Sequence, residues 1–264
     1  MQWKDLLAQS ELDSALNVIT DNIKGEPKDA NLRSVFIELL CIKGDYERAD
    51  EQLMQSIKLF PEYLAGASQL RHLVKAAQAR ADFASGAASA QILGKNEQMT
   101  KSQVDLNLAF TNSNFEQALA LSRKLESDRT IEPFVVNGTE TLDVRDIDDR
   151  LGGYLELFSS KGNYFLVPLS SVVYLELKPA QTILENIWRP IEFDIEGLGE
   201  GEAHMPLTYI DSESNAQKLG RETDWKPFGE KVFLGQGQKC WLVGDDSLPI
   251  CNLTTLERQV EVPQ

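Results

Sequence analysis

Hydrophobic positions recur at helical spacing through the first half of the chain. Ala49 is followed by apolar residues four and eight positions later, at Leu53 and Ile57, and the same spacing follows Ala15, which lies 34 residues upstream. Apolar residues at this spacing share one face of an α-helix, and a small alanine lets a partner helix approach closely. A proline follows each alanine by twelve residues, beyond the expected helix end, where its missing N–H does no harm. The pattern predicts consecutive pairs of packed helices.

The interval between these alanines, 34 residues, equals the period of tetratricopeptide (TPR) repeats, and Gly44–Ala49 (GDYERA) matches part of that pattern. A third, degenerate copy begins at Asn114 and has Ser122 where an apolar residue is expected. We therefore predict a short TPR-like α-α superhelix over residues 1–130. Stacked helix pairs of this kind leave a concave groove that typically binds an extended or helical peptide.

The pattern changes after residue 130, where glycines and prolines interrupt short runs of β-branched and aromatic residues. Asn137 and Gly138 separate two such runs, and an Asn-Gly pair is typical of a type I′ turn between antiparallel strands. A second hairpin is predicted over residues 154–167, around a Ser-Ser-Lys-Gly turn. Short strands at this density favour a small antiparallel sheet that is rolled or closed. We predict a β-rich, barrel-like domain over residues 131–264.

Charge is divided unequally between the two predicted domains. The chain of 264 residues carries 26 lysines and arginines against 41 aspartates and glutamates, a net charge of −15. Residues 1–130 hold 15 basic and 18 acidic side chains, a net charge of −3. Residues 131–264 hold the other 11 basic and 23 acidic side chains, a net charge of −12. An acidic surface repels nucleic-acid phosphates and anionic lipid, so we predict that neither nucleic acid nor a membrane surface is a partner.

The sequence lacks the usual signals for a membrane or an oxidising compartment. No apolar run approaches the ~20 residues that span a bilayer. The first residues do not show the basic segment and apolar core of a secretory signal. The cysteines, Cys41, Cys240 and Cys251, are too few for a disulfide framework. These features predict a cytoplasmic protein without membrane insertion.

Candidate chemistry is sparse. His72 and His204 fall in different predicted domains, and neither has a cysteine or histidine at metal-ligand spacing. The acidic segment Asp143–Asp149 lacks the central glycine and closing glutamate of a calcium loop. We predict no metal, no cofactor and no catalytic residue, and therefore a binding protein and not an enzyme.

The concave face of the predicted superhelix is the candidate partner site. Its first-helix register presents polar and small apolar side chains, and the next helix adds a basic stripe that also includes Arg80. A solvated helix face is the favoured interpretation of that stripe, and partner binding is the alternative. The residues predicted to bind a partner are Asn31, Ser34, Glu38, Cys41, Ile42, Arg71, His72 and Lys75.

Two stretches of the second half have sequences more specific than ordinary loops require. The first runs from Asp146 to Glu156 and the second from Arg221 to Gln238. An arginine among carboxylates can form a bidentate ion pair, and glycines permit positive φ or a close backbone approach, so structural bracing is the favoured interpretation. The alternative is a small-ligand pocket or an enzyme site around Tyr164, Trp188 and Trp225.

In their order along the chain these motifs resemble the ImpE/TagJ (SciE-type) family. The matching segments are Leu39–Ala49, Asp146–Gly152, Asn163–Pro168, Trp188–Pro190, Arg221–Trp225 and Leu234–Gln238. The resemblance assigns structural roles to Arg150, Gly152, Tyr164, Pro168, Trp188, Arg221, Trp225, Gly235 and Gly237. The chain departs from the family pattern mainly at residues 196–202 and 84–98.

Members of that family are accessory proteins of bacterial type VI secretion systems. The resemblance therefore implies a non-enzymatic adaptor that binds the N-terminal helix of the small sheath subunit, TssB/VipA, and affects how the ClpV ATPase handles the sheath. It implies no cofactor and carries over no catalytic residue. A TPR scaffold outside secretion is a further alternative, against which the second-half motifs argue.

Overall fold

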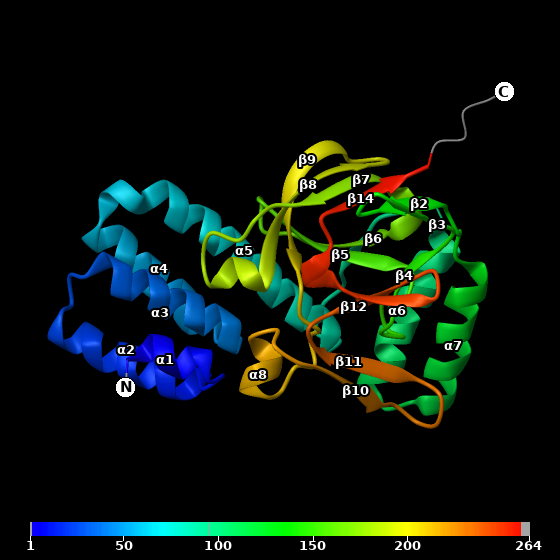
Figure 1. Cartoon of the computed structure of the whole chain (residues 1–264). Helices are drawn as coiled ribbons and strands as arrows, with labels where there is room; N and C mark the ends of the chain where they lie inside the picture. The colour runs from blue at the N-terminus through cyan, green and yellow to red at the C-terminus, as the bar shows by residue number, and fades with distance from the viewer. Residues whose placement is uncertain (1, 95, 260–264) are drawn as a thin grey trace.

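The computed structural model describes residues 2–94 and 96–259 (Figure 1). The first half is helical, as the periodicity predicts, and its helices pack against their neighbours in chain order. Ala15, Ala49 and Ala118 are completely buried at these helix contacts. The helices are α1 (Trp3–Ala8), α2 (Leu12–Gly25), α3 (Ala30–Lys43), α4 (Tyr46–Leu59), α5 (Leu64–Ala84), α6 (Glu97–Thr111) and α7 (Phe115–Asp128).

Local sequence sets the ends of α3. The Asp29 side chain accepts hydrogen bonds from the backbone N–H groups of Asn31 and Leu32, which caps the start of the helix. Gly44 ends the helix at a φ of 89°, a left-handed conformation that glycine adopts without steric cost. The helix pair α3–α4 therefore turns where the GDYERA sequence begins.

The second half is built of antiparallel strands and short helical turns. Its helical turns include η3 (Leu184–Asn186) and α8 (Asn215–Lys218), and η1 (Pro61–Tyr63) links α4 to α5. One strand, β1 (Gln91–Ile92), lies in the first half. The strands of the second half are β2 (Phe134–Val136), β3 (Thr139–Thr141), β4 (Val144–Asp146), β5 (Tyr154–Ser159), β6 (Tyr164–Pro168), β7 (Val172–Leu177), β8 (Trp188–Ile195), β9 (Gly199–Pro206), β10 (Thr223–Pro227), β11 (Phe233–Gly237), β12 (Cys240–Val243), β13 (Asp246–Pro249) and β14 (Thr255–Arg258). Both predicted hairpins, β2–β3 and β5–β6, are present.

The sheets are open, so the prediction of a barrel is wrong. The largest has the strand order β1-β6-β5-β9-β8-β7-β14-β2-β3, with smaller sheets β13-β12-β4 and β10-β11. A barrel requires the two end strands to pair. Here β1, which comes from the helical half, pairs in parallel with β6 and covers one edge, while β3 lies at the opposite edge.

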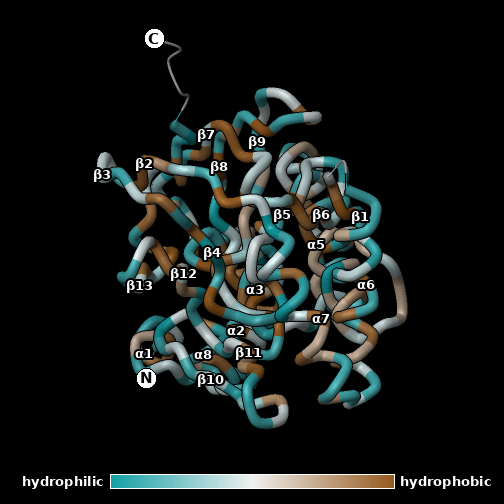
Figure 2. Tube along the Cα trace, turned by 90° about the vertical axis from the view of Figure 1, so that its right-hand side faces the viewer, coloured by the Kyte–Doolittle hydropathy of each residue, from teal (hydrophilic) through white to brown (hydrophobic). Residues whose placement is uncertain are grey.

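The two halves share a hydrophobic core. Helix α5 runs from the other helices into the β-rich half and lies against β5 and β6 (Figures 1 and 2). Phe83 of α5 packs on Tyr164 of β6, and Tyr46 of α4 packs on Trp188 of β8, with ring centroids 6.1 Å apart in both pairs. The division into domains 1–130 and 131–264 remains a prediction about folding units.

No helix within residues 2–94 and 96–259 is both long and apolar enough to cross a bilayer.

Candidate functional site: a groove between the two halves

A groove lies between the helical half and the β-rich half. Helices α3, α4 and α5 form one wall, η3 with strands β8 and β9 forms the other, and the cavity volume is about 660 Å³. Of the predicted partner-binding residues, Asn31, Ser34 and Glu38 line this α3–β9 groove. Much of the rest of the lining is apolar, and includes Leu53, Phe60, Ala67, Leu70, Leu184 and Trp188.

The sequence pattern places Cys41 and Ile42 on an open face of α3, but the structure buries both side chains in the core. The prediction is wrong at these two positions because η3 and α8, from the second half of the chain, pack against α3. At this contact the backbone N–H of Leu184 donates a hydrogen bond of 3.1 Å to the Glu38 carboxylate. Burial raises the pKa of Glu38.

The basic stripe on α5 does not line the groove. Arg71 forms a salt bridge of 2.6 Å with Asp50 of α4. His72 Nδ1 lies 2.6 Å from the backbone oxygen of Ser160, and the Lys75 side chain lies beside Gly162 in the β5–β6 turn. The stripe therefore serves contacts within the chain, which neither of its two sequence interpretations anticipates.

The fourth basic residue of the stripe, Arg80, is buried at the contact between the two halves. Its guanidinium donates two hydrogen bonds, of 2.6 and 2.7 Å, to the Glu156 carboxylate of β5. Lys239 forms a second salt bridge to Glu156, and the Tyr164 hydroxyl donates to it at 2.7 Å. Burial by itself would raise the pKa of Glu156, but the charges of Arg80 and Lys239 outweigh it and hold that pKa well below its usual range. Sequence spacing alone could not reveal this network, because its members lie 76 and 83 residues apart.

The DIDDR motif ties loops of the second half together. Asp146 accepts a hydrogen bond of 2.8 Å from the Tyr209 hydroxyl, and Asp148 accepts one of 2.8 Å from the backbone of Gly235. Arg150 forms a salt bridge of 2.8 Å with Asp211 and stacks over the Phe110 ring of α6. The motif thus joins the segment after β4 to β11 and to the helical half. Burial raises the pKa of Asp146 to about 6 and that of Asp148 to about 7.

Replacing Asp148 with asparagine should change how stability depends on pH. A carboxyl with a raised folded-state pKa binds its proton more tightly when folded. It therefore stabilises the fold at low pH, and that stabilisation is lost as the pH rises from 3.8 through about 7. Asparagine does not titrate, so the variant does not lose this stabilisation. Its free energy of unfolding, relative to that of the wild type, should therefore rise by up to about 1.4 kcal/mol per pH unit across this window.

Urea unfolding at about pH 4.5, 6 and 7.5 measures this difference. Asp245→Asn, at an exposed turn, is the control for loss of one carboxylate. A difference between variant and wild type that stays constant over the three pH values would contradict the prediction for Asp148.

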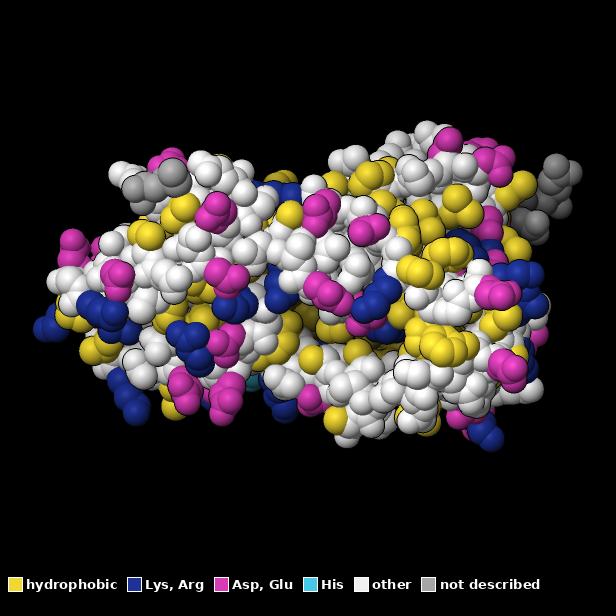
Figure 3. Space-filling model, turned by 90° about the horizontal axis from the view of Figure 1, so that it is seen from below, with side chains coloured by type: hydrophobic (Ala, Val, Ile, Leu, Met, Phe, Trp, Pro, Cys, Tyr) yellow, Lys and Arg dark blue, Asp and Glu magenta, His cyan; other side chains and the backbone are white. Residues whose placement is uncertain are grey.

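The second motif forms an arm that reaches back to the N-terminal helices. The Arg221 guanidinium hydrogen-bonds to the backbone oxygen of Leu7 and to the Ser10 hydroxyl. The Gly237 backbone, at a φ of 79°, passes against the backbone oxygen of Glu222. Seen from below, hydrophobic side chains gather where β10, β11 and the start of α7 lie (Figure 3).

Two of the remaining motif residues share a neighbour, because Tyr164 and Trp188 both pack on the Phe158 ring, with ring centroids 6.3 and 5.5 Å away. Tyr164 lines a cavity of about 10 Å³, Trp188 lines the α3–β9 groove, and Trp225 packs on the Tyr209 ring at 5.8 Å. Gly152 has a φ of 47°, and Pro168 ends β6 beside Gly94. The three aromatic residues therefore take part in ring packing, Tyr164 and Trp188 through their shared neighbour and Trp225 through Tyr209.

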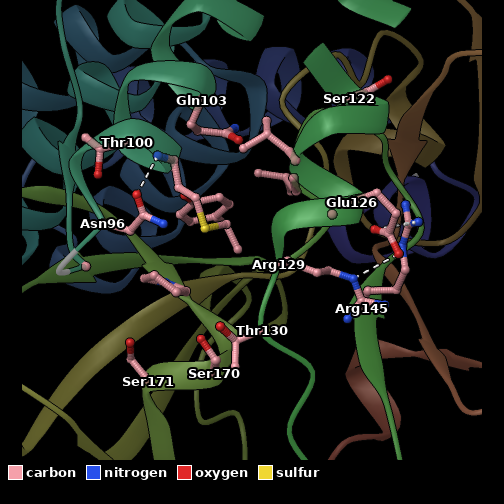
Figure 4. A pocket seen from close by; sticks show the side chains of 18 of the residues that line it. Asn96, Thr100, Gln103, Ser122, Glu126, Arg129, Thr130, Arg145, Ser170 and Ser171 are labelled. Carbon is pink, nitrogen blue, oxygen red and sulfur yellow. Dashed lines mark hydrogen bonds and ion pairs between the residues drawn. The ribbon is translucent and has the colours of Figure 1, made fainter. Parts of the chain in front are cut away.

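A second cavity, of about 790 Å³, lies between α6, α7 and the loops that flank β5 (Figure 4). Glu126 of α7 is held by two arginines on its wall, Arg129 at 2.9 Å and Arg145 at 3.0 Å. The negative charge of Glu126 therefore offsets part of the positive charge of the two arginines. Across the described part of the chain, no group of three or more histidine, cysteine, aspartate or glutamate side chains is arranged to hold a metal ion.

The fold and the groove define a mixed α and β protein with an apolar cleft between a helical half and a β-rich half. Residues 138–257 match the family model of the ImpE protein. The chain is 24% identical over 238 residues to the type VI secretion system accessory component TagJ of Pseudomonas aeruginosa, covering 88% of this chain and 84% of that protein. The crystal structure of protein VPA1032 from Vibrio parahaemolyticus is 62% identical, with a TM-score of 0.97 over 99% of each chain.

Residues 138–257 thus carry an ImpE family domain, and the resemblance to the ImpE/TagJ family that the ordered motifs predict is confirmed.

Proposed function

We propose that this protein is a non-enzymatic accessory adaptor of a bacterial type VI secretion system, acting in the cytoplasm without a cofactor. It binds the N-terminal helix of the small sheath subunit in the α3–β9 groove. Family membership supports the secretion role. The observation that carries the binding mode is the apolar groove, which is bounded by helix pairs that we interpret as TPR-like repeats.

The walls of the groove favour a helical partner. Helices satisfy their own backbone hydrogen bonds, and β8 and β9 pair with each other along their whole length. A bound segment therefore finds most of the backbone along these walls already hydrogen-bonded. Buried backbone N–H and C=O groups need partners, so a segment that enters an apolar groove of this kind must satisfy them internally. An α-helix with one apolar face does so.

Replacing Gly66 with tryptophan should block the groove. Gly66 lies on α5, lines the groove and has a negative φ, and a Cβ added there would have no neighbouring atom within 4 Å, so the fold tolerates a larger residue. The indole would occupy space that an apolar anchor of the partner needs. We expect a labelled N-terminal peptide of the small sheath subunit, titrated by fluorescence anisotropy, to bind at least about tenfold more weakly.

Gly25→Trp is the matched control, because Gly25 also has open space around it but lies at the end of α2, outside the groove lining. This variant should bind the peptide within about twofold of the wild type. If Gly66→Trp retains full affinity while keeping the wild-type melting temperature, the α3–β9 groove is not the binding site.

A further inference from the structure

We infer that the α3–β9 groove selects helices whose polar flanks carry lysine or arginine. The inference rests on the proposed function and names the chemistry of the partner. The carboxylates that line the groove are Glu38, Glu62, Glu185 and Glu202, and within the described residues this lining includes no lysine or arginine. An amphipathic helix with basic flanks would place its apolar face on the apolar residues of the groove and its cationic side chains beside these carboxylates.

The acidic groups stand on both walls. Glu62 lies in η1 of the helical wall, and Glu202 lies on β9 of the opposite wall. Both are exposed, and neither forms a salt bridge with another described residue. Glu185, in η3, is half-buried and accepts a hydrogen bond from the backbone of Gln181. A helix lying in the groove would therefore have free carboxylates on both sides.

Arg71 and His204 do little to cancel these charges. Arg71, on the same helix as the groove wall, is paired with Asp50. His204 lines the groove, but burial lowers its pKa, which favours the neutral ring. Exposed like charges repel within a Debye length of about 8–10 Å, so acidic flanks on a partner helix would be disfavoured. The net charge of −15 also attracts a cationic segment from longer range.

Two synthetic helical peptides test the inference. They share one apolar face and differ only in their flanks, which carry lysine in one and glutamate in the other. We expect the lysine-flanked peptide to bind at least about tenfold more tightly at low salt, and the ratio to shrink as salt is raised, because exposed charges are screened. Equal affinities would overturn the inference.

Reversing the charge of chosen glutamates tests which carboxylates cause the preference for the lysine-flanked peptide. The double variant Glu62→Lys/Glu202→Lys should lose most of the preference for the lysine-flanked peptide. The control Glu51→Lys/Glu140→Lys makes the same change in net charge at exposed positions of α4 and β3, outside the groove lining, and should keep it. An equal loss in both double variants would assign the preference to net charge and overturn the role of the groove carboxylates.

Gly66→Trp separates this inference from the proposed function. If it blocks both peptides while they bind the wild type equally, the groove is the binding site and only the charge selection is wrong. If it blocks neither, the proposed binding site is wrong, and the inference about its carboxylates falls with it.

Discussion

Replacing Glu156 with glutamine should lower the free energy of unfolding by about 3–5 kcal/mol, the usual cost of removing one partner from a buried ion network. Glu156 is the carboxylate that compensates both Arg80 and Lys239, and all three residues are at most 6% exposed. Glutamine keeps the shape of the side chain but leaves two buried cations without a counter-charge. Because Arg80 comes from α5 and Glu156 from β5, the loss should weaken the contact between the two halves of the molecule.

Urea unfolding of the full chain measures this loss. The matched control is Glu213→Gln, which breaks the exposed pair between Lys226 and Glu213. Exposed pairs contribute roughly 0–1 kcal/mol, so the control should stay within that range of the wild type. Equal effects of the two substitutions would show that the buried network adds no more to stability than a surface pair.

Gly237→Ala should destabilise the protein by about 2–4 kcal/mol, through overpacking and backbone strain. A Cβ at this position would overlap the backbone oxygen of Glu222, which no side-chain movement can relieve. The φ of 79° is also one that alanine adopts only with strain. Glu222 accepts the backbone hydrogen bond of Gln238 at 2.8 Å, so relief of the overlap would disturb the start of the β10–β11 pair.

Gly25→Ala is the control, since Gly25 has a negative φ and no neighbour within 4 Å of an added Cβ. Alanine there should leave the denaturation midpoint unchanged or slightly higher, because glycine is the poorer helix former. A Gly237→Ala protein with the wild-type midpoint would mean that the turn before β12 can move freely.

Local patterns anticipated the elements of this fold well. The alanine-led stripes predicted helices whose small residues are buried, and Ala15 and Ala49 are both at zero exposure. The Asn-Gly pair predicted a hairpin, and Asn137 and Gly138 both have positive φ values, of 51° and 83°. Each of these features depends on residues a few positions apart, where backbone geometry relates sequence spacing directly to a face or a turn.

The candidate site was anticipated in part. Asn31, Ser34 and Glu38 line the α3–β9 groove, whereas Cys41 and Ile42 do not. Helical periodicity shows which residues share a face, but it does not show that η3 and α8, about 140 to 180 residues later, cover that face. The repeat pattern therefore could not predict the second wall of the groove, which η3, β8 and β9 form.

The sequence by itself determined the helices, the hairpins, the acidic balance and, through its ordered motifs, the family. The tertiary structure decided how those parts meet: an open sheet whose edge is paired by β1, a buried Arg80 held by Glu156 of the other half, and an acid-lined groove between the halves. The physical reason is the range of the interactions. Helix and turn formation depend on neighbours along the chain. The partner of Arg80 and the charge of the groove depend on residues that only folding brings together.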